Sequence, residues 1–443
     1  MAKPEHRSVL VASDLTSSRR WDTPVQPSDD DWLASVARLR PEQFVLRADA
    51  GVASGDSDEP LLTRDIDGWR TGRYIGEIRH QGRTLRIRPR LGVQVIGEWM
   101  SAAHNVAVLP RAAGKGRDTQ TLLIQLVAAM WRASVLDAGR HALARRRVEQ
   151  RHVGDRIRGR LDVHGTARLR AVGDGRVAST SRDRALDTTT AAAIVRCDRV
   201  LDRHLADTRW RGDRLEDILH TMRAAVGSRP ALPSRDDLAR VRYSPIAARW
   251  RPAADLSRRI ATLDLLTTSA EDDSTYGALV DVAELWELFL LRCLTDATAE
   301  TVTHGTRTAI DRHLLTSTAD PARGLGRLYP DLFVGPPKEP LVVIDAKYKR
   351  HRYPEDVARE DLYQLAAYAS AFRPRRAMLA YPEVETAEDR GDEGAWTNAE
   401  GTRFEFHRVP VRRGSCTDWF QTWLSRDADT GSAEERPRPA RTV

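Results

Sequence analysis

The stretch Arg327–Arg350, with the sequence RLYPDLFVGPPKEPLVVIDAKYKR, decides the fold of the last third of the chain. Two short apolar segments in it, Leu328–Val334 and Leu341–Tyr348, flank a turn that contains Gly335 and three prolines. Apolar runs of this length on either side of a turn rich in glycine and proline are typical of a β-hairpin. We therefore expect two adjacent antiparallel strands here.

Three charged side chains of this hairpin are predicted to meet at one end of the sheet. With the fold centred on the turn, Asp331 lies opposite Ile344 or Asp345. A bulge or twist at that point brings the two carboxylates together. Side chains alternate between the faces of a strand, so Asp345 and Lys347 share one face.

The scarcity of lysine draws attention to the same spot. The chain contains 70 lysines and arginines, of which only five are lysines, and Lys347 and Lys349 are two of these five. Arginine therefore supplies most of the positive charge elsewhere. A compact ammonium reaches a reacting water or phosphate in a way that a broad guanidinium does not.

Two carboxylates and a lysine suit the hydrolysis of a phosphodiester bond. This reaction needs an activated in-line water and a sink for developing negative charge, and Mg²⁺ supplies both. Mg²⁺ prefers oxygen ligands, so we expect Asp331, Asp345 and the backbone carbonyl of Ala346 to bind it, with Mn²⁺ as an alternative ion. Lys347 is expected beside the attacking water or the scissile phosphate, with a pKa lowered by the metal and other cations.

The spacing P-D, thirteen residues, D-A-K resembles the PD-(D/E)xK nuclease superfamily, with Pro330, Asp331, Asp345 and Lys347 in the defining positions. The resemblance implies a nuclease fold for residues 271–425, a mixed sheet flanked by helices. Arg376–Tyr381 and Thr402–Val411 are predicted to be further strands of this sheet.

Helices are predicted before and after the hairpin. Leu279–Leu294 is apolar nearly all round, as a buried helix would be. Its acidic stripe, which includes Glu287, is either a solvent-exposed edge or turned inward so that Glu287 faces the carboxylates. In the helix Asp361–Phe372, Gln364 and Tyr368 lie four residues apart and share a face.

The Q-x-x-x-Y pair, Gln364 and Tyr368, resembles an element of RecB-type nuclease domains that supports the site and contacts DNA. Lys349 is a further candidate for DNA contact. The alternative for Gln364 is a capping box with Asp361 at the N-cap, and the alternative for Tyr368 is a place in the core. Both alternatives stay open from the sequence.

Composition bounds the class of protein. A net charge of +7 and a pI near 9.5 favour a polyanionic partner. The three cysteines lie far apart and suit a reducing compartment. No signal peptide is recognisable, and no apolar run approaches the roughly 20 residues of a membrane helix. We expect a cytoplasmic protein that does not contact membranes.

The rest of the chain predicts an α+β and α/β multi-domain protein. Tyr74–Arg79 and Thr84–Pro89 form a second predicted hairpin, whose arginines mark either a solvated face or a surface for nucleic acid or an acidic protein. The basic run Ala144–Arg170 is either a solvated face or a set of phosphate contacts. The expected regions are a variable segment (1–60), a β-rich partner-contacting region (61–112), a mainly helical middle domain (113–270), the nuclease domain (271–425) and a disordered tail (426–443).

Several stretches occur in the order found in McrC, the nuclease subunit of the McrBC modification-dependent restriction systems. They are YIGEIRHQGRTLRIRPRLG (Tyr74–Gly92), RIRGRLDV (Arg156–Val163), DRALDTTTAAAIV (Asp183–Val195), DVAELWELFL (Asp281–Leu290) and DAKYKR with DLYQLAAYA. The chain resembles that family over roughly residues 70–385.

This resemblance implies metal-binding carboxylates at Asp331 and Asp345, a catalytic Lys347 and a supporting Glu287. It also implies double-stranded, modified DNA as substrate and an McrB-type AAA+ GTPase ring as partner. The chain itself has no G-x-x-x-x-G-K-[ST] loop and is expected to bind no nucleotide. We expect the hairpin region Tyr74–Pro89 to enter the ring. The alternatives are a RecB-like repair or processing nuclease and a non-catalytic activator of an AAA+ ring.

Overall fold

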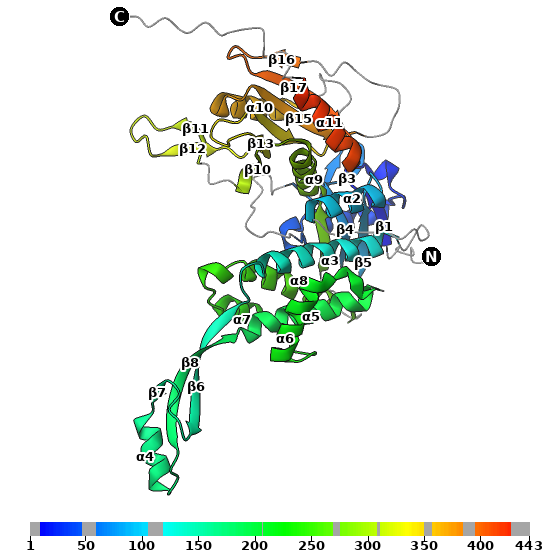
Figure 1. The fold of residues 1–443 in the computed structure, drawn as a ribbon. Coiled ribbons are helices and arrows are strands. Elements are labelled where there is room, and N and C mark those ends of the chain that lie inside the picture. Colours follow the sequence, from blue (N-terminus) through cyan, green and yellow to red (C-terminus); the bar gives the residue numbers. More distant parts are fainter. Residues whose placement is uncertain are drawn as a thin grey trace, which may run out of the picture. The chain divides into compact units, whose positions relative to one another are not determined.

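The computed structural model describes residues 9–46, 59–104, 118–205, 207–268, 275–307, 311–349, 357–383 and 395–426 (Figure 1). It falls into two compact units. The first contains residues 1–46, 50–126 and 272–443, and the second contains residues 47–49 and 127–271. The polar, Gly/Ser/Asp-rich composition of residues 49–59 predicts a loop, and all of this segment except Glu59 lies outside the described residues. The predicted disordered tail (426–443) also lies outside them beyond Arg426.

A four-stranded sheet forms the first part of unit 1. The strands are β1 (Val9–Ser13), β5 (Arg83–Arg88), β4 (Tyr74–His80) and β9 (Tyr276–Asp281), in the order β1-β5-β4-β9. The predicted β4–β5 hairpin is confirmed, and its two-residue turn places Gln81 and Gly82 at φ values of 49° and 72°. Both strands are paired on both sides, so this hairpin offers no free strand edge to a partner.

Strand β9 departs from the expected domain boundary. The sequence led us to begin a helix at Leu279 and a separate domain at residue 271. Instead Tyr276–Asp281 is a strand that pairs with β4, and helix α9 (Val282–Ala297) starts after it. The N-terminal sheet and the C-terminal region therefore belong to one compact unit.

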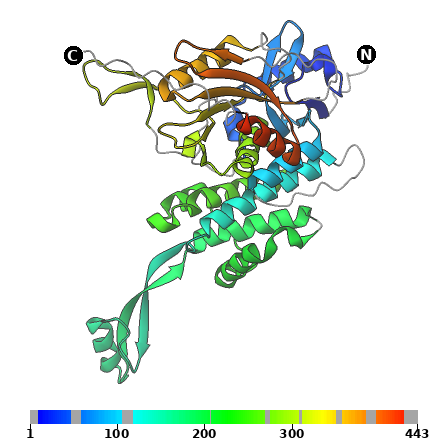
Figure 2. The same cartoon turned by 45° about the horizontal axis from the view of Figure 1, so that its top comes forward.

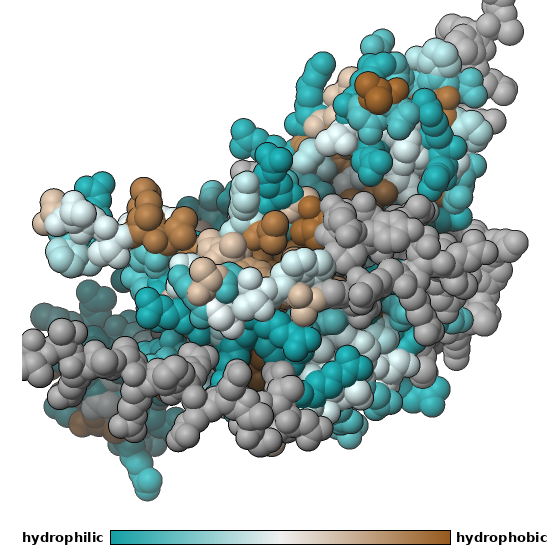
Figure 3. All heavy atoms as spheres, turned by 90° about the horizontal axis from the view of Figure 1, so that it is seen from above, coloured by the Kyte–Doolittle hydropathy of each residue, from teal (hydrophilic) through white to brown (hydrophobic). Residues whose placement is uncertain are grey.

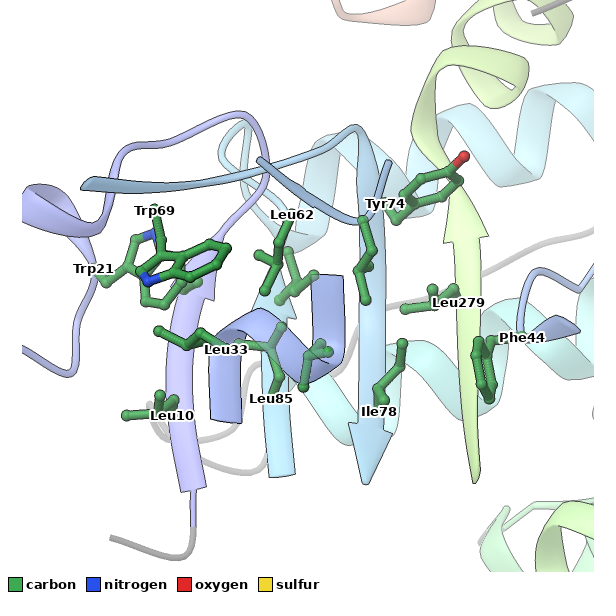
Figure 4. Packing of buried hydrophobic residues seen from close by; sticks show 14 of the residues in the cluster. Leu10, Trp21, Leu33, Phe44, Leu62, Trp69, Tyr74, Ile78, Leu85 and Leu279 are labelled. Atoms are coloured by element: carbon green, nitrogen blue, oxygen red, sulfur yellow. The ribbon is translucent and has the colours of Figure 1, made fainter. Parts of the chain in front are cut away.

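Figure 4 shows the hydrophobic core of the N-terminal sheet. Helix α1 (Asp30–Ala37) places Leu33 against Leu10 and Leu85 of the sheet, and Leu279 of β9 joins the same cluster. The small hairpin of β2 (Leu62–Asp65) and β3 (Gly68–Thr71) adds Trp69. Residues 1–60, which the sequence predicts to be a variable segment, thus contribute strand β1 and helix α1 to the core.

The arginines of the β4–β5 hairpin are held in contacts within the molecule. Arg73 pairs with Asp281 at 3.1 Å and Arg83 with Asp29 at 2.5 Å. The other pairs are Arg70 with Asp65, Arg86 with Glu77, Arg88 with Asp22 and Arg90 with Asp14, and Arg79 donates a hydrogen bond to Tyr276. Internal pairing, which the sequence did not indicate, accounts for this cationic face.

A six-stranded mixed sheet forms the C-terminal part of unit 1, in the order β10-β13-β14-β15-β17-β16. Strands β13, β14, β15 and β17 match the predicted strands. Neighbours β14, β15 and β17 run parallel, whereas β13 and β14 are antiparallel. The strands are β10 (Val302–His304), β13 (Leu332–Val334), β14 (Val342–Ala346), β15 (Arg376–Pro382), β16 (Ala395–Thr397) and β17 (Arg403–Val409).

Helices α9, α10 (Arg359–Phe372), α11 (Arg413–Ser425) and α2 (Val93–His104) belong to the same unit. Trp286 on α9 packs against Trp99 on α2 with ring centroids 4.8 Å apart. The indole of Trp286 donates to the carbonyl of Ala380 in β15, which fixes α9 to the sheet. A separate hairpin, β11 (His313–Thr316) and β12 (Gly324–Arg327), precedes β13.

Helices form the compact part of unit 2. Trp131 on α3 donates to Ser257 on α8, and both side chains are buried. Thr190 near the start of α5 bonds Asp187 and Tyr243 at 2.8 Å each. The helices are α3 (Asp118–Ala138), α5 (Thr188–His204), α6 (Gly212–Val226), α7 (Arg235–Arg240) and α8 (Trp250–Thr268). Short 3₁₀ turns elsewhere in the chain are η1 (Ser18–Arg20), η2 (Pro27–Asp29), η3 (Pro41–Gln43), η4 (Thr208–Trp210), η5 (Pro245–Ala247) and η6 (Gly305–Arg307).

A long β-ribbon interrupts the helices of unit 2, where the sequence led us to expect a mainly helical domain. Strands β6 (Arg145–Gly154) and β8 (Val177–Leu186) pair over ten residues, with β7 (Arg160–Leu161) and α4 (Val163–Ala171) between them (Figures 1 and 2). This arm, Arg145–Leu186, carries twelve arginines against five acidic residues. Its net charge equals the +7 of the whole chain.

The surface of the described residues is mainly hydrophilic in the view of Figure 3, with hydrophobic residues in small, separate patches. None of the helices within the described ranges is long and apolar enough to cross a membrane.

Candidate active site

The β13–β14 hairpin brings Asp331 and Asp345 to the same end of the sheet. Leu332 pairs with Ile344, so Asp331, one residue before β13, comes level with Asp345. Its Oδ2 accepts a hydrogen bond of 2.7 Å from the backbone N–H of Ala346. The predicted juxtaposition of the two carboxylates is confirmed, and it follows from the pairing register without a bulge.

A glycine on a neighbouring element fixes the segment that carries Asp331. The N–H of Gly305 donates to the carbonyl of Asp331 at 2.9 Å. A Cβ at position 305 would lie only 1.7 Å from the carbonyl oxygen of Pro330. A residue with a side chain at this position would therefore displace the Pro330–Asp331 backbone.

A cavity of about 750 Å³ collects the predicted site residues. It is lined from β13 and β14, from α9 and α10, and from the N-terminal region. All eight residues singled out from the sequence line it: Glu287, Asp331, Asp345, Ala346, Lys347, Lys349, Gln364 and Tyr368.

Lys347 is buried at this site, with only 8% of its surface exposed. Its Nζ lies 2.9 Å from Oδ2 of Asp345 and 3.8 Å from Oδ1 of Asp361. Burial opposes the charge of the ammonium, but the neighbouring Asp345 and Asp331 outweigh burial and raise the pKa of Lys347. The lowered pKa that we expected from nearby cations is therefore not produced by the residues of the chain.

Gln364 links Lys347 to helix α10. Its Oε1 accepts a hydrogen bond of 2.8 Å from the ammonium of Lys347. Its Nε2 donates to the hydroxyl of Tyr368 at 2.9 Å, and this hydroxyl donates to the carbonyl of Tyr329 at 3.1 Å. Gln364 and Tyr368 thus belong to one chain of hydrogen bonds that ends at Lys347.

The capping-box alternative for Gln364 is wrong. Helix α10 begins at Arg359 with Ala358 at the N-cap, so Asp361 lies inside the first turn. The carboxylate of Asp361 accepts from Lys349 Nζ at 3.1 Å through both oxygens, and it also approaches Lys347. Sequence reasoning considered Asp361 only as a possible N-cap and missed these contacts. Their signal was the position of Asp361 three residues before Gln364, which places it on the same helix face.

Glu287 on α9 lines the cavity, in agreement with the inward alternative for this helix. Its Oε2 lies 3.3 Å from Nε2 of His304, a contact that the sequence did not indicate. Burial, together with the charges of Asp281, Glu284 and Asp345, raises the pKa of Glu287 to about 8. Burial, Glu287 and Asp345 likewise raise the pKa of Asp331 well above its ordinary value.

The three carboxylates therefore share excess negative charge that a cation would offset. Their oxygen atoms are of the type that Mg²⁺ prefers. Among the described residues, however, no three His, Cys, Asp or Glu side chains form a ready-made metal site. Asp345 contacts the ammonium of Lys347 instead. The donor chemistry fits a divalent ion, and the lysine supplies part of the compensating charge.

These features define a class: a mixed α/β protein whose central sheet presents two aspartates and a lysine to a cavity. Glu287 and Gln364 also line this cavity. The chain belongs to the family described as McrBC 5-methylcytosine restriction system component, which matches residues 69–382. No curated protein matches the chain.

Two solved chains from Thermococcus gammatolerans match this chain. One comes from the refined half-complex of a tetradecameric assembly of McrB AAA+ hexamers with bound McrC, with 15% identity and a TM-score of 0.54. The match covers 95% of this chain and 99% of that chain, and it shows a shared fold. The other comes from the cryo-EM structure of the McrBC complex, with 14% identity, a TM-score of 0.36 and coverage of 66% and 88%.

Proposed function

We propose that this chain is the nuclease subunit of an McrBC-type restriction system and hydrolyses phosphodiester bonds in modified, foreign DNA. One observation carries the proposal: Asp331, Asp345 and Lys347 converge in a single cavity, which Glu287 also lines. The order of strands β13 and β14 with helices α9 and α10 supports a PD-(D/E)xK nuclease fold for this sheet.

The residues of the site have distinct roles in this proposal. When bound, Mg²⁺ or Mn²⁺ supplies a nucleophile at neutral pH and a sink for charge on the phosphate. Asp331, Asp345 and the carbonyl of Ala346 would hold the ion, with Glu287 in support. Lys347 stays protonated and places its positive charge beside the scissile phosphate.

The positions of the supporting side chains follow from their contacts. Gln364 orients the ammonium of Lys347 through its 2.8 Å hydrogen bond. Tyr368 orients Gln364 in turn. Lys349 is more exposed, with 55% of its side chain accessible, and is placed to meet the DNA backbone.

We further propose that the chain acts in the cytoplasm while bound to an McrB-type AAA+ GTPase ring. The similar solved chain lies in an assembly of McrB AAA+ hexamers with bound McrC. This chain has no nucleotide-binding loop of its own, so ring-driven movement along DNA would come from the partner.

The test is cleavage of plasmid DNA carrying 5-methylcytosine by the full chain mixed with its ring partner and Mg²⁺. Lys347→Ala and Asp345→Ala are each expected to reduce the cleavage rate on the order of a hundredfold or more. Lys338→Ala is the matched control, because Lys338 is an exposed lysine in the turn of the same hairpin. Ring binding is measured in parallel by size-exclusion chromatography.

Each outcome decides between the candidates. Parent-like cleavage by Lys347→Ala refutes the assignment of the site. Stimulation of the ring by a parent protein that does not cut DNA identifies a non-catalytic activator. Cleavage that needs free DNA ends and no GTPase identifies a RecB-like processing nuclease.

A further inference from the structure

Arg73 lines the candidate active site although it lies outside the sheet that carries the aspartates and Lys347. It directly precedes β4 of the N-terminal sheet. Its side chain is largely buried, with 12% of its surface exposed, and Nε and Nη2 each lie 3.1 Å from Oδ2 of Asp281. Nε also lies 3.3 Å from Oε2 of Glu59, which lines the same cavity. Arg73 thus links the N-terminal sheet to the cavity.

Asp281 connects this arginine to helix α9. One carboxylate oxygen, Oδ1, caps the helix by accepting from the N–H groups of Ala283 at 3.0 Å and Glu284 at 3.4 Å. The other oxygen, Oδ2, takes the contacts from Arg73. A backbone hydrogen bond also joins Arg73 to the start of α9: the N–H of Val282 donates to the carbonyl of Arg73 at 3.1 Å. Arg73 therefore fixes the orientation of the capping carboxylate.

Helix α9 carries Glu287 in the turn after this cap. Its side chain lies in the cavity with Asp331 and Asp345. Arg73 also acts on Glu287 through its charge, in opposition to Asp281, Glu284 and Asp345. A shift or rotation of the first turn of α9 would therefore move the Glu287 carboxylate relative to the two aspartates.

We propose that Arg73 is a positioning residue of the nuclease site, which acts through the Asp281 cap and helix α9 to set the place of Glu287. The inference rests on the proposed function and extends it, because it makes the N-terminal sheet a part of the active site. A residue of this kind changes the rate of the chemical step and leaves DNA affinity largely unaltered.

The experiment measures kcat and KM for cleavage of 5-methylcytosine plasmid by the full chain with its ring partner. Arg73→Ala is expected to lower kcat about tenfold or more, as loss of a partner outside the reacting groups typically does. KM for DNA is expected to stay within about twofold, since the guanidinium is already bound to Asp281. Arg70→Ala is the matched control, because Arg70 is a half-exposed arginine on the preceding strand β3.

A double variant separates positioning from general support of the fold. If Arg73 acts through Glu287, then Arg73→Ala/Glu287→Gln cuts within about twofold of Glu287→Gln alone. Independent, multiplicative losses would overturn the proposal, and so would a rise in KM with unchanged kcat.

Hydrogen exchange gives a readout that needs no activity. In Arg73→Ala the amides of Ala283 and Glu284 are expected to exchange faster, while those of the β15 core keep their protection. Asp281→Ser retains a capping oxygen but loses the ion pair. It is expected to keep the helix protected and still lose kcat. Unchanged kcat in both variants would refute the positioning role.

Lys347→Ala distinguishes this inference from the proposed function. If Lys347→Ala cuts like the parent, the proposed function fails. If Lys347→Ala is inactive while Arg73→Ala cuts like the parent, only the role of Arg73 is refuted.

Discussion

The ammonium of Lys347 donates a 2.8 Å hydrogen bond to the side-chain carbonyl of Gln364, a residue 17 positions further along the chain. This bond joins strand β14 to helix α10 inside the cavity. It holds the ammonium beside Asp345, so the lysine side chain is already oriented before DNA binds.

The contact predicts the effect of removing the amide. Gln364→Ala should lower the cleavage rate about 10- to 100-fold, because Lys347 loses the group that orients it. Tyr368→Phe should cost less than about tenfold, since Gln364 keeps its bond to Lys347. Single-turnover cleavage of plasmid DNA checks both values. Equal losses for the two variants would contradict this prediction, because they would show that Gln364 cannot orient Lys347 without the hydroxyl of Tyr368.

A second prediction concerns Lys349, whose ammonium contacts Asp361 while its side chain stays largely exposed. Lys349→Ala should weaken DNA binding and reduce the slope of log affinity against log salt by about one, as expected for one phosphate contact. The maximal cleavage rate should remain close to that of the parent. Binding to a DNA duplex between about 50 and 200 mM salt measures the slope. An unchanged slope would show that Lys349 contacts Asp361 but no DNA phosphate.

The pH dependence of stability tests the charge of Glu287. Its pKa is raised from 4.5 to about 8 in the folded protein. A raised folded pKa means that stability is complete below about 4.5 and is lost as the pH rises toward 8. In EDTA, Glu287→Gln should therefore melt at an increasingly higher temperature than the parent across this range, and the difference should level off above pH 8.

Addition of Mg²⁺ provides the complementary measurement. Because ionised carboxylates bind the ion, Mg²⁺ should raise the melting temperature of the parent more at pH 8.5 than at pH 6. The gain should be smaller in Glu287→Gln. Glu300→Gln, a substitution at an exposed glutamate beyond α9, is the control. A pH-independent difference between parent and Glu287→Gln would contradict the raised pKa.

A final prediction concerns Glu405, a buried glutamate in β17 that anchors the far side of the sheet. Arg376 binds both of its oxygens, at 2.8 and 2.9 Å, and His407 and Trp423 add contacts of 2.7 Å each. Burial alone would raise the pKa of Glu405, but these hydrogen bonds lower it below the ordinary 4.5. The carboxylate is therefore more stable in the folded protein than in the unfolded chain.

Glu405→Gln should cost roughly 3–5 kcal/mol of unfolding free energy at pH 7, because Arg376 is left with an uncompensated buried charge. A lowered folded pKa gives stability that is present above pH 4.5 and lost as the pH falls below it. The difference between parent and Glu405→Gln should thus shrink in acid, as measured by urea denaturation. Arg403→Ala, at a half-exposed partner of the same glutamate, should cost less than about 1 kcal/mol.

The strands and the chemistry of the central motif could be predicted because their signals are local. Apolar runs around a Gly/Pro turn specify the β13–β14 hairpin, and strand alternation places Asp345 and Lys347 on one face. Helical spacing likewise places Gln364 and Tyr368 together. These patterns act over a few residues, so the sequence by itself determined the hairpin and the convergence of its charged groups.

The arm shows where local patterns fail. Strand β6 has no buried residue and β8 buries only Ala178 and Ser179, so no buried face imposes an alternating apolar pattern on the sequence. Pairing of β6 with β8 across an intervening helix holds the ribbon together instead. The run of arginines therefore gave no sign of a β-structure, and the surrounding region 113–270 was expected to be mainly helical.

Only the tertiary structure decided which distant residues complete the site. Arg73 and Asp281 lie 208 positions apart and meet because β9 pairs with β4. Asp361 reaches the cavity because α10 packs against the six-stranded sheet, and His304 reaches Glu287 because β10 pairs with β13 in that sheet. Such contacts depend on pairing register and on the burial of whole helix faces, which no short segment encodes. The sequence determined the aspartates and the lysine, and the packing of the chain decided what holds them.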